Sequence, residues 1–219
     1  MSGTGSAALL EPAVRASYLR ALLSACDEFG PPAAEIRERL GDVHQTRIEC
    51  AGPLAWLPIE TDLALQRALD AVLGVERTRE FLLANLREFL AASLVQNLVT
   101  TAVGLFGLDP GSFARLLPPA WGLLYRETGR WSVVRRELSP LGLDRDWREI
   151  ELRLSELPSA CVGEHAWLTA VATVHHALLI LCGREGAVEL SERRLEAPAQ
   201  VVFRLAWKQS ARPLGADPR

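Results

Sequence analysis

AQVVFRLAWK, residues 199–208, alternates apolar and polar side chains along most of its length. Its apolar side chains at every second position would share one face of a strand, because successive side chains in a strand point to opposite faces. These side chains are Val201, Phe203, Leu205 and Trp207. A second stretch, REIELRLSEL at residues 148–157, has the same period of two. The two stretches therefore predict two strands, each with one buried face.

A further strand-like stretch precedes each of these two. WSVVRREL begins at Trp131, and AVELSERRLE begins at Ala187. Each pair predicts a hairpin, about 131–157 and about 187–208, and an apolar helix of about 162–181 separates the two hairpins. Two isolated hairpins cannot bury their apolar faces. We therefore predict an α+β fold, in which helices pack on one four-stranded antiparallel sheet made of both hairpins, with the intervening helix buried.

The rest of the chain is predicted to be mainly helical. A long apolar stretch from about Glu76 to Phe106 keeps a period of 3.6 and is expected to form a central helix. The organisation that we predict is a disordered N-terminus at 1–11, an N-terminal helical region at 12–58, an α+β domain at 59–208 and a disordered tail at 209–219.

Composition restricts the function. The formal net charge of the 219 residues is −3, so there is no basic excess to neutralise phosphates, and we predict no nucleic-acid partner. The uncharged stretches at 89–106 and 166–182 are amphipathic or carry central histidines, so we predict no membrane span. The N-terminal residues MSGTGSAALLEP lack the basic and apolar regions of a secretory signal, which predicts a cytoplasmic location.

The histidines do not form a chelating pair. His175 and His176 are adjacent and would point about 100° apart on a helix, whereas His165 and His176 would be about 16 Å apart. We therefore predict no metal site. His175, in an apolar helix, is interpreted either as a hydrogen-bonded core residue or as a ligand-binding residue. The chain has no G-x-S-x-G motif and no glycine-rich phosphate loop, so we predict that it is not an enzyme.

The segment RLLPPAWGLLYRETGRW, residues 115–131, is dense in aromatic side chains and arginines. Trp121 and Tyr125 would lie one turn apart on the same helix face. Two interpretations stay open: core packing, or a pocket between this helix and the sheet that suits an aromatic or anionic ligand. The candidate ligand-binding residues are Trp121, Tyr125, Arg126, Arg130, Trp131 and His175.

The element order and the segments YRETGRW (125–131) and VVFRLAW (201–207) carry a resemblance. Over about residues 60–208 the chain resembles bacterial domains related to the 4-vinyl-reductase and haem-nitric-oxide-binding ligand domains, and most of all uncharacterised members found in myxobacteria. The resemblance implies small-molecule sensing or protein scaffolding, commonly as a dimer, and no particular reaction.

The resemblance raises the question of whether the chain binds haem as a cofactor. A haem site of that kind needs one proximal histidine and partners for the propionates, and the chain has no Tyr-x-Ser-x-Arg stretch. We therefore predict no cofactor. His175 is the residue to substitute first if haem is found.

Two hypotheses of function follow. The first is a non-enzymatic cytoplasmic binding domain, a dimeric protein-interaction adaptor in bacterial signalling whose partner is a second copy or another protein. The alternative is a small-molecule sensor with an apolar or aromatic-lined pocket between helices and sheet.

Overall fold

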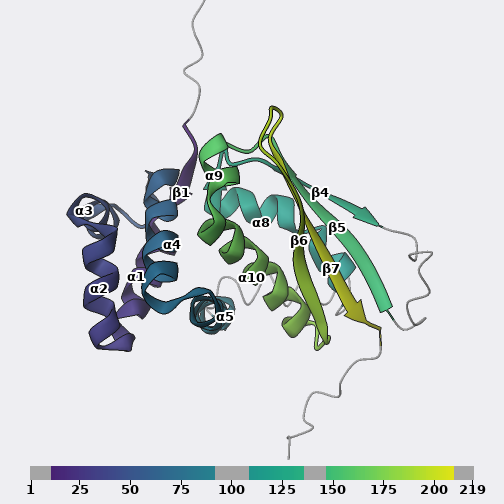
Figure 1. Cartoon of the computed structure of the whole chain (residues 1–219), viewed down its shortest axis with the longest axis horizontal. Coiled ribbons are helices and arrows are strands. Elements are labelled where there is room, and N and C mark those ends of the chain that lie inside the picture. The colour runs from purple at the N-terminus through teal and green to yellow at the C-terminus, as the bar shows by residue number, and fades with distance from the viewer. Residues whose placement is uncertain (1–10, 92–108, 136–146, 210–219) are drawn as a thin grey trace, which may run out of the picture.

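The computed structural model describes residues 11–91, 109–135 and 147–209. Figure 1 shows a group of helices at one end of the molecule and a sheet at the other, with α8 and α10 between them. The helices are α1 (Ala16–Cys26), a short 3-10 turn (Asp27–Phe29), α2 (Pro31–Leu40), α3 (Asp42–Cys50), α4 (Ile59–Leu73), α5 (Val75–Ala91), α7 (Pro110–Ala114), α8 (Leu117–Leu124), α9 (Ser159–Gly163) and α10 (His165–Leu181). The strands are β1 (Ala13–Arg15), β2 (Trp56–Pro58), β3 (Tyr125–Arg126), β4 (Arg130–Arg135), β5 (Trp147–Ser155), β6 (Gly186–Arg194) and β7 (Gln200–Lys208).

The predicted four-stranded antiparallel sheet is confirmed. Its strand order is β4-β5-β7-β6, so the two hairpins join through the pairing of β5 with β7. In this register Leu152 lies opposite Phe203 and Leu154 lies opposite Val201, and all four side chains are buried. On the other face Glu149 accepts a hydrogen bond from Arg204 at 2.6 Å. The alternation in the sequence thus separates a core face from a polar face.

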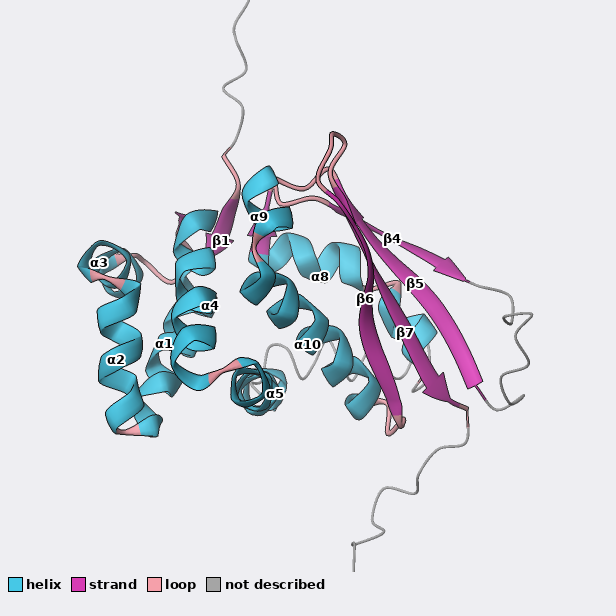
Figure 2. Ribbon diagram, in the orientation of Figure 1, coloured by secondary structure: helices cyan, strands magenta, loops and turns pink. Residues whose placement is uncertain are grey.

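The helix between the hairpins covers the inner face of the sheet, as Figure 2 shows. It is broken near Glu164, so the predicted helix of 162–181 is in fact α9 followed by α10. The helix ends where Gly183, at φ +62°, donates its amide to the Ile180 carbonyl and Arg184 donates to Leu179. This is the Schellman arrangement, which favours glycine at that position.

A second, small sheet was not predicted. Strand β1 pairs with β2 on one side and with β3 on the other. The predicted N-terminal helical region of 12–58 thus also contains β1 and β2. Because β1 lies between β2 and β3, it brings Trp56 and Arg126 to the same side of the molecule from positions far apart in the sequence. Strands of two or three residues are too short for periodicity to identify.

One cluster of buried side chains joins the helical end of the molecule to the sheet end. It includes Leu19 and Ile36 from the N-terminal helices as well as Trp167 and Phe203 from the other end. The division at residue 58 or 59 stays a prediction. The expected disorder at 1–11 and 209–219, the continuation of the central helix to Phe106 and the turn of the first hairpin fall wholly or mainly outside the described residues.

The described segments contain no helix that is both long enough and apolar enough to cross a membrane.

Removal of the Phe203 ring tests how much the buried inner face of the sheet contributes to the unfolding free energy. Phe203 is fully buried opposite Leu152, so the Phe203→Ala variant leaves a cavity, and we expect it to lose about 3–5 kcal/mol of unfolding free energy. Urea unfolding followed by circular dichroism measures this loss. The matched control is Arg193→Ala on the exposed edge strand β6, which should change stability by about 0.5 kcal/mol or less. Equal losses in the two variants would contradict the predicted role of this face.

Candidate functional site

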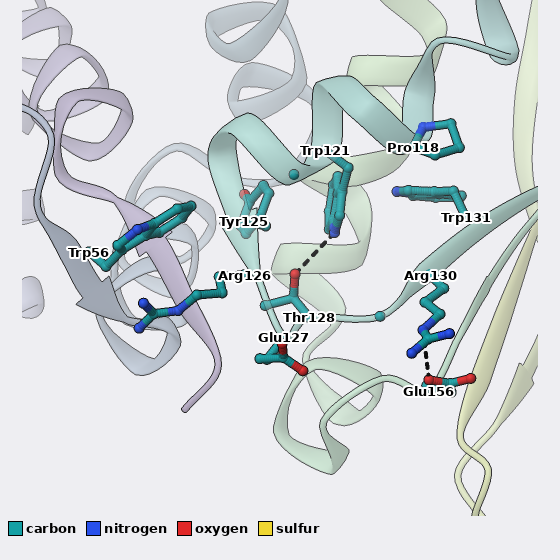
Figure 3. A pocket seen from close by; sticks show the side chains of 12 residues that line it. Trp56, Pro118, Trp121, Tyr125, Arg126, Glu127, Thr128, Arg130, Trp131 and Glu156 are labelled. Carbon is teal, nitrogen blue, oxygen red and sulfur yellow. Dashed lines mark hydrogen bonds and ion pairs between the residues drawn. The ribbon is translucent and has the colours of Figure 1, made fainter. Parts of the chain in front are cut away.

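Five of the six predicted ligand-binding residues line one cleft of about 700 Å³, which we call the cleft (Figure 3). They are Trp121, Tyr125, Arg126, Arg130 and Trp131. His175 is not among the residues that line the cleft. It lines a second space of about 430 Å³, which we call the cavity. The structure thus separates the predicted set into two candidate sites.

The cavity lies between α1, α5, α8 and α10. Each helix contributes side chains spaced three or four residues apart, which is the spacing that places them on one helix face. These residues include Tyr18 and Leu22 from α1, Leu82 and Leu86 from α5, Leu117, Ala120 and Leu124 from α8, and Ala170, Val171, Val174 and His175 from α10. The walls are predominantly apolar, as in most small-molecule sites.

Trp121 and Tyr125 line both the cavity and the cleft, and we call this pair the aromatic wall. Their rings stack with centroids 4.1 Å apart and an interplanar angle of 21°. Trp131 and Trp167 meet the Trp121 ring edge to face. Such contacts fix the orientation of the rings as well as burying them. The same two rings thus pack in the core and line both spaces, and ligand binding there stays a prediction.

A turn with unusual backbone angles follows the aromatic wall. Glu127 has φ +52° and Gly129 has φ +104°. A Cβ atom at Gly129 would lie 2.8 Å from the Ser155 carbonyl oxygen, so only glycine lets the chain pass there. Between them, Thr128 accepts a hydrogen bond from Trp121 Nε1 at 3.0 Å. The turn thus fixes one end of the wall while reversing the chain into β4.

Asp62 of α4 fixes the other end. Its Oδ2 accepts hydrogen bonds from the Tyr125 hydroxyl at 2.8 Å and from Trp167 Nε1 at 3.0 Å. Its Oδ1 accepts a third bond, from Gln66 Nε2, at 3.0 Å. The carboxyl group is fully buried. It therefore joins α4, β3 and α10 at one point.

Burial alters the acidity of this cluster. Loss of hydration raises the pKa of Asp62, and the hydrogen bonds from its three partners oppose that rise. Burial and the nearby Asp62 carboxyl group raise the pKa of Tyr125 well above its ordinary value, and the pKa of Tyr18 also rises. Both tyrosines therefore keep their hydroxyl protons, and Tyr125 donates its proton to Asp62.

His175 is the polar group of the cavity without a polar partner. It is 1% exposed, and neither ring nitrogen has a hydrogen-bond partner among the described residues. Its ring packs edge to face on Trp131 at 4.8 Å and on Phe203 at 5.3 Å. Burial lowers the pKa of His175 to about 3, so the imidazole is neutral near pH 7 and has a lone pair available for a ligand.

Sequence reasoning missed Asp62, Tyr18 and Trp56 as site residues. A signal for Asp62 was present, because it shares a helix face with Leu65 and Leu69 and is therefore a carboxylate on a buried stripe. Its partners lie 63 and 105 residues away in the sequence, and no local pattern identifies them.

The fold matches solved structures of H-NOX domains, although no protein-family model and no curated protein matches the chain. One neighbour, from work on haem distortion in the H-NOX family, has a TM-score of 0.56 at 11% identity and covers 94% of this chain and 99% of its own. An oxygen-binding H-NOX domain related to soluble guanylate cyclases, solved as its oxygen complex, has a TM-score of 0.54 at 11% identity with the same coverage. A variant H-NOX domain of T. Tengcongensis has a TM-score of 0.56 at 11% identity and covers 89% of this chain and 97% of its own.

The chain therefore has an H-NOX-like α+β fold, as the resemblance implied. The shared fold extends beyond residues 60–208, because coverage of 94% must include part of the N-terminal helices.

Two predictions are contradicted by these neighbours. The protein-interaction adaptor is contradicted, because the neighbours are domains studied for haem and for bound oxygen, and the alternative of a small-molecule sensor fits them better. The prediction of no cofactor is contradicted by the same finding, which points to haem.

The Asp62→Asn variant should remove a pH dependence of stability. Because the folded chain raises the pKa of Asp62, the contribution of this group to stability is complete below its unfolded pKa of about 4 and is lost as pH rises through the raised value. Asparagine stays neutral, and its amide can donate to Gln66 Oε1, which has no partner among the described residues. Wild-type unfolding free energy should therefore fall relative to that of Asp62→Asn as pH increases above about 4.

Urea unfolding between pH 4 and pH 8 measures this difference. Asp42→Asn, at an exposed carboxyl group, is the matched control and should run parallel to the wild type. If Asp62→Asn also runs parallel, the assigned role of the carboxyl group is wrong.

Proposed function

We propose that this protein is a non-enzymatic small-molecule sensor domain and that its ligand binds in the cavity between α1, α5, α8 and α10. Haem is the first candidate ligand. The proposal is supported by the fold shared with H-NOX domains and by the position of His175 on the cavity wall.

The single observation that carries this proposal is the unpartnered imidazole of His175. A buried polar group without a hydrogen bond is destabilising by about 1–3 kcal/mol. Such a group needs an explanation, and a role in ligand binding is one. Neutral imidazole is a common axial ligand of haem iron.

The cavity residues fit haem at the iron and along the faces of the macrocycle. His175 would hold the iron, and side chains such as Leu22, Leu117 and Val171 would contact the apolar ring. Among the described residues that line the cavity there is no arginine or lysine for the propionates. The neutral donors of the lining include Ser24 and Asn85, and Glu28 is acidic. Bound haem would supply an iron centre that can take a further small ligand.

Within this proposal, the aromatic wall reports occupancy of the cavity. Tyr125 contacts the cavity through its ring and Asp62 through its hydroxyl group, so a ligand that moves the ring acts on α4 as well. The cytoplasmic location and the homodimer or protein partner expected from the sequence stay predictions.

Haemin titration tests the proposal. We expect the wild-type protein to develop a Soret band at about one haemin per chain, because the cavity offers one imidazole. His175→Ala should bind haemin at least about tenfold more weakly, since even 1.4 kcal/mol of lost ligation gives that factor. The matched control is His176→Ala, which removes the adjacent half-buried imidazole that is not in the cavity lining and should bind as the wild type does.

Metal-free protoporphyrin IX distinguishes coordination of the iron by His175 from the fit of the porphyrin ring in the cavity. It should bind the wild type and His175→Ala equally, and Ala170→Phe, which fills the cavity, should exclude both porphyrins. A wild-type protein that takes up neither porphyrin and shows only the bare chain mass in native mass spectrometry would rule out the proposal. If haemin binds His175→Ala as tightly as it binds the wild type, His175 is not the ligand.

A further inference from the structure

The cleft is separate from the cavity except at the aromatic wall. Its lining comes from β2, α8, β3, β4 and the turn after β5, and it includes Trp56, Arg126, Arg130 and Glu156, which the cavity lacks. Figure 3 shows Trp56 on one side and Trp121 on the other, with Arg126 close to Trp56. The sensor proposal assigns no role to this cleft.

The two indoles at its sides are held in place by other groups. The Arg15 guanidinium carbon lies 3.7 Å from the centroid of the Trp56 ring. Arg15 is itself held by hydrogen bonds to the carbonyls of Leu54 and Leu123. On the opposite side, Trp121 is held by its bond to Thr128 and by its stacking on Tyr125. Aromatic surfaces held in this way lose little conformational entropy when a flat ligand binds.

The charges in the cleft are unevenly compensated. Arg130 pairs with Glu156 at 3.1 Å. Arg126 forms no ion pair with any described residue, and its Nε is buried without a hydrogen-bond partner. Its guanidinium carbon lies 5.2 Å from the centroid of the Trp56 ring. Arg126, which has no ion-pair partner among the described residues, therefore lies beside an aromatic surface, and the exposed Glu127 also lines the cleft.

We propose that the cleft is a second ligand site, which binds a flat aromatic molecule that carries one carboxylate group. The aromatic ring lies between Trp56 and the aromatic wall, and the carboxylate accepts hydrogen bonds from Arg126. A planar guanidinium can donate two parallel hydrogen bonds to a carboxylate, which fixes the orientation of the ligand as well as its charge. The proposal does not rest on a ligand in the cavity.

The test uses 2-naphthoate as the probe and isothermal titration calorimetry as the measurement. We expect saturable binding of one 2-naphthoate per chain. The neutral analogue 2-naphthalenemethanol should bind about tenfold more weakly or worse, because a hydrogen bond to a charged group contributes about 1.5–3 kcal/mol. Equal affinities for the two probes would show that no carboxylate is recognised.

Variants locate the site. Arg126→Gln should weaken 2-naphthoate binding by about tenfold or more, and Arg126→Lys should restore part of that loss because it keeps the charge. Arg130→Gln is the matched control in the same cleft. Because Glu156 already compensates Arg130, we expect a change of about twofold or less. Equal losses at Arg126 and Arg130, or no binding by the folded wild type, overturn the proposal.

The His175→Ala variant distinguishes binding of 2-naphthoate in the cleft from binding in the cavity. It removes a group of the cavity and should leave 2-naphthoate binding unchanged, so either proposal can fail while the other stands. If His175→Ala abolishes 2-naphthoate binding in a protein that is still folded, the probe occupies the cavity and the second site does not exist.

Discussion

The buried carboxyl group of Asp62 is the constraint on which the arrangement of this molecule depends. A carboxyl group in an apolar interior is strongly unfavourable unless hydrogen bonds replace its lost hydration. Here three donors do so, and two of them reach Asp62 from β3 and α10. Any displacement of α4 relative to those elements would leave Tyr125 or Trp167 without an acceptor in the interior. Helix α4 is therefore fixed to β3 and to α10 by polar contacts as well as by apolar packing.

This constraint also shapes the two candidate sites. Tyr125 donates to Asp62, and Trp121, stacked on it, donates to Thr128, so both rings of the aromatic wall are held through their polar atoms. The wall therefore keeps its position without a ligand, and sites that are largely formed in advance bind with less entropic cost. His175 differs from these groups because no described residue satisfies its nitrogens. The region thus combines a fixed wall with one group that is free to bind a ligand.

The sequence predicted the large sheet because the alternation in β5 and β7 is long enough to define a buried face. It also predicted that Trp121, Tyr125, Arg126, Arg130 and Trp131 converge, because they lie within eleven consecutive residues around one turn. It could not predict the small sheet, whose strands are too short to show a period. It could not predict Trp56 beside Arg126 either, because that contact depends on the pairing of β1 with two distant strands. Ala13 is aligned with Pro58 and with Arg126, which lie 45 and 113 residues further along the chain. Contacts set by tertiary pairing leave no local signal in the sequence.

The aromatic wall borders both sites. A ligand in one site can therefore change the affinity of the other site for its ligand, even where the two ligands do not compete. If a ligand in the cavity displaces Trp121, it changes the width of the cleft, and thermodynamic linkage requires that a ligand in the cleft alters affinity for the cavity by the same factor. The bonds to Thr128 and Asp62 resist such displacement, so the coupling between the sites is limited by the strength with which those bonds hold the wall. The same buried carboxyl group that joins α4 to β3 and α10 therefore limits how strongly binding in one site changes the affinity of the other.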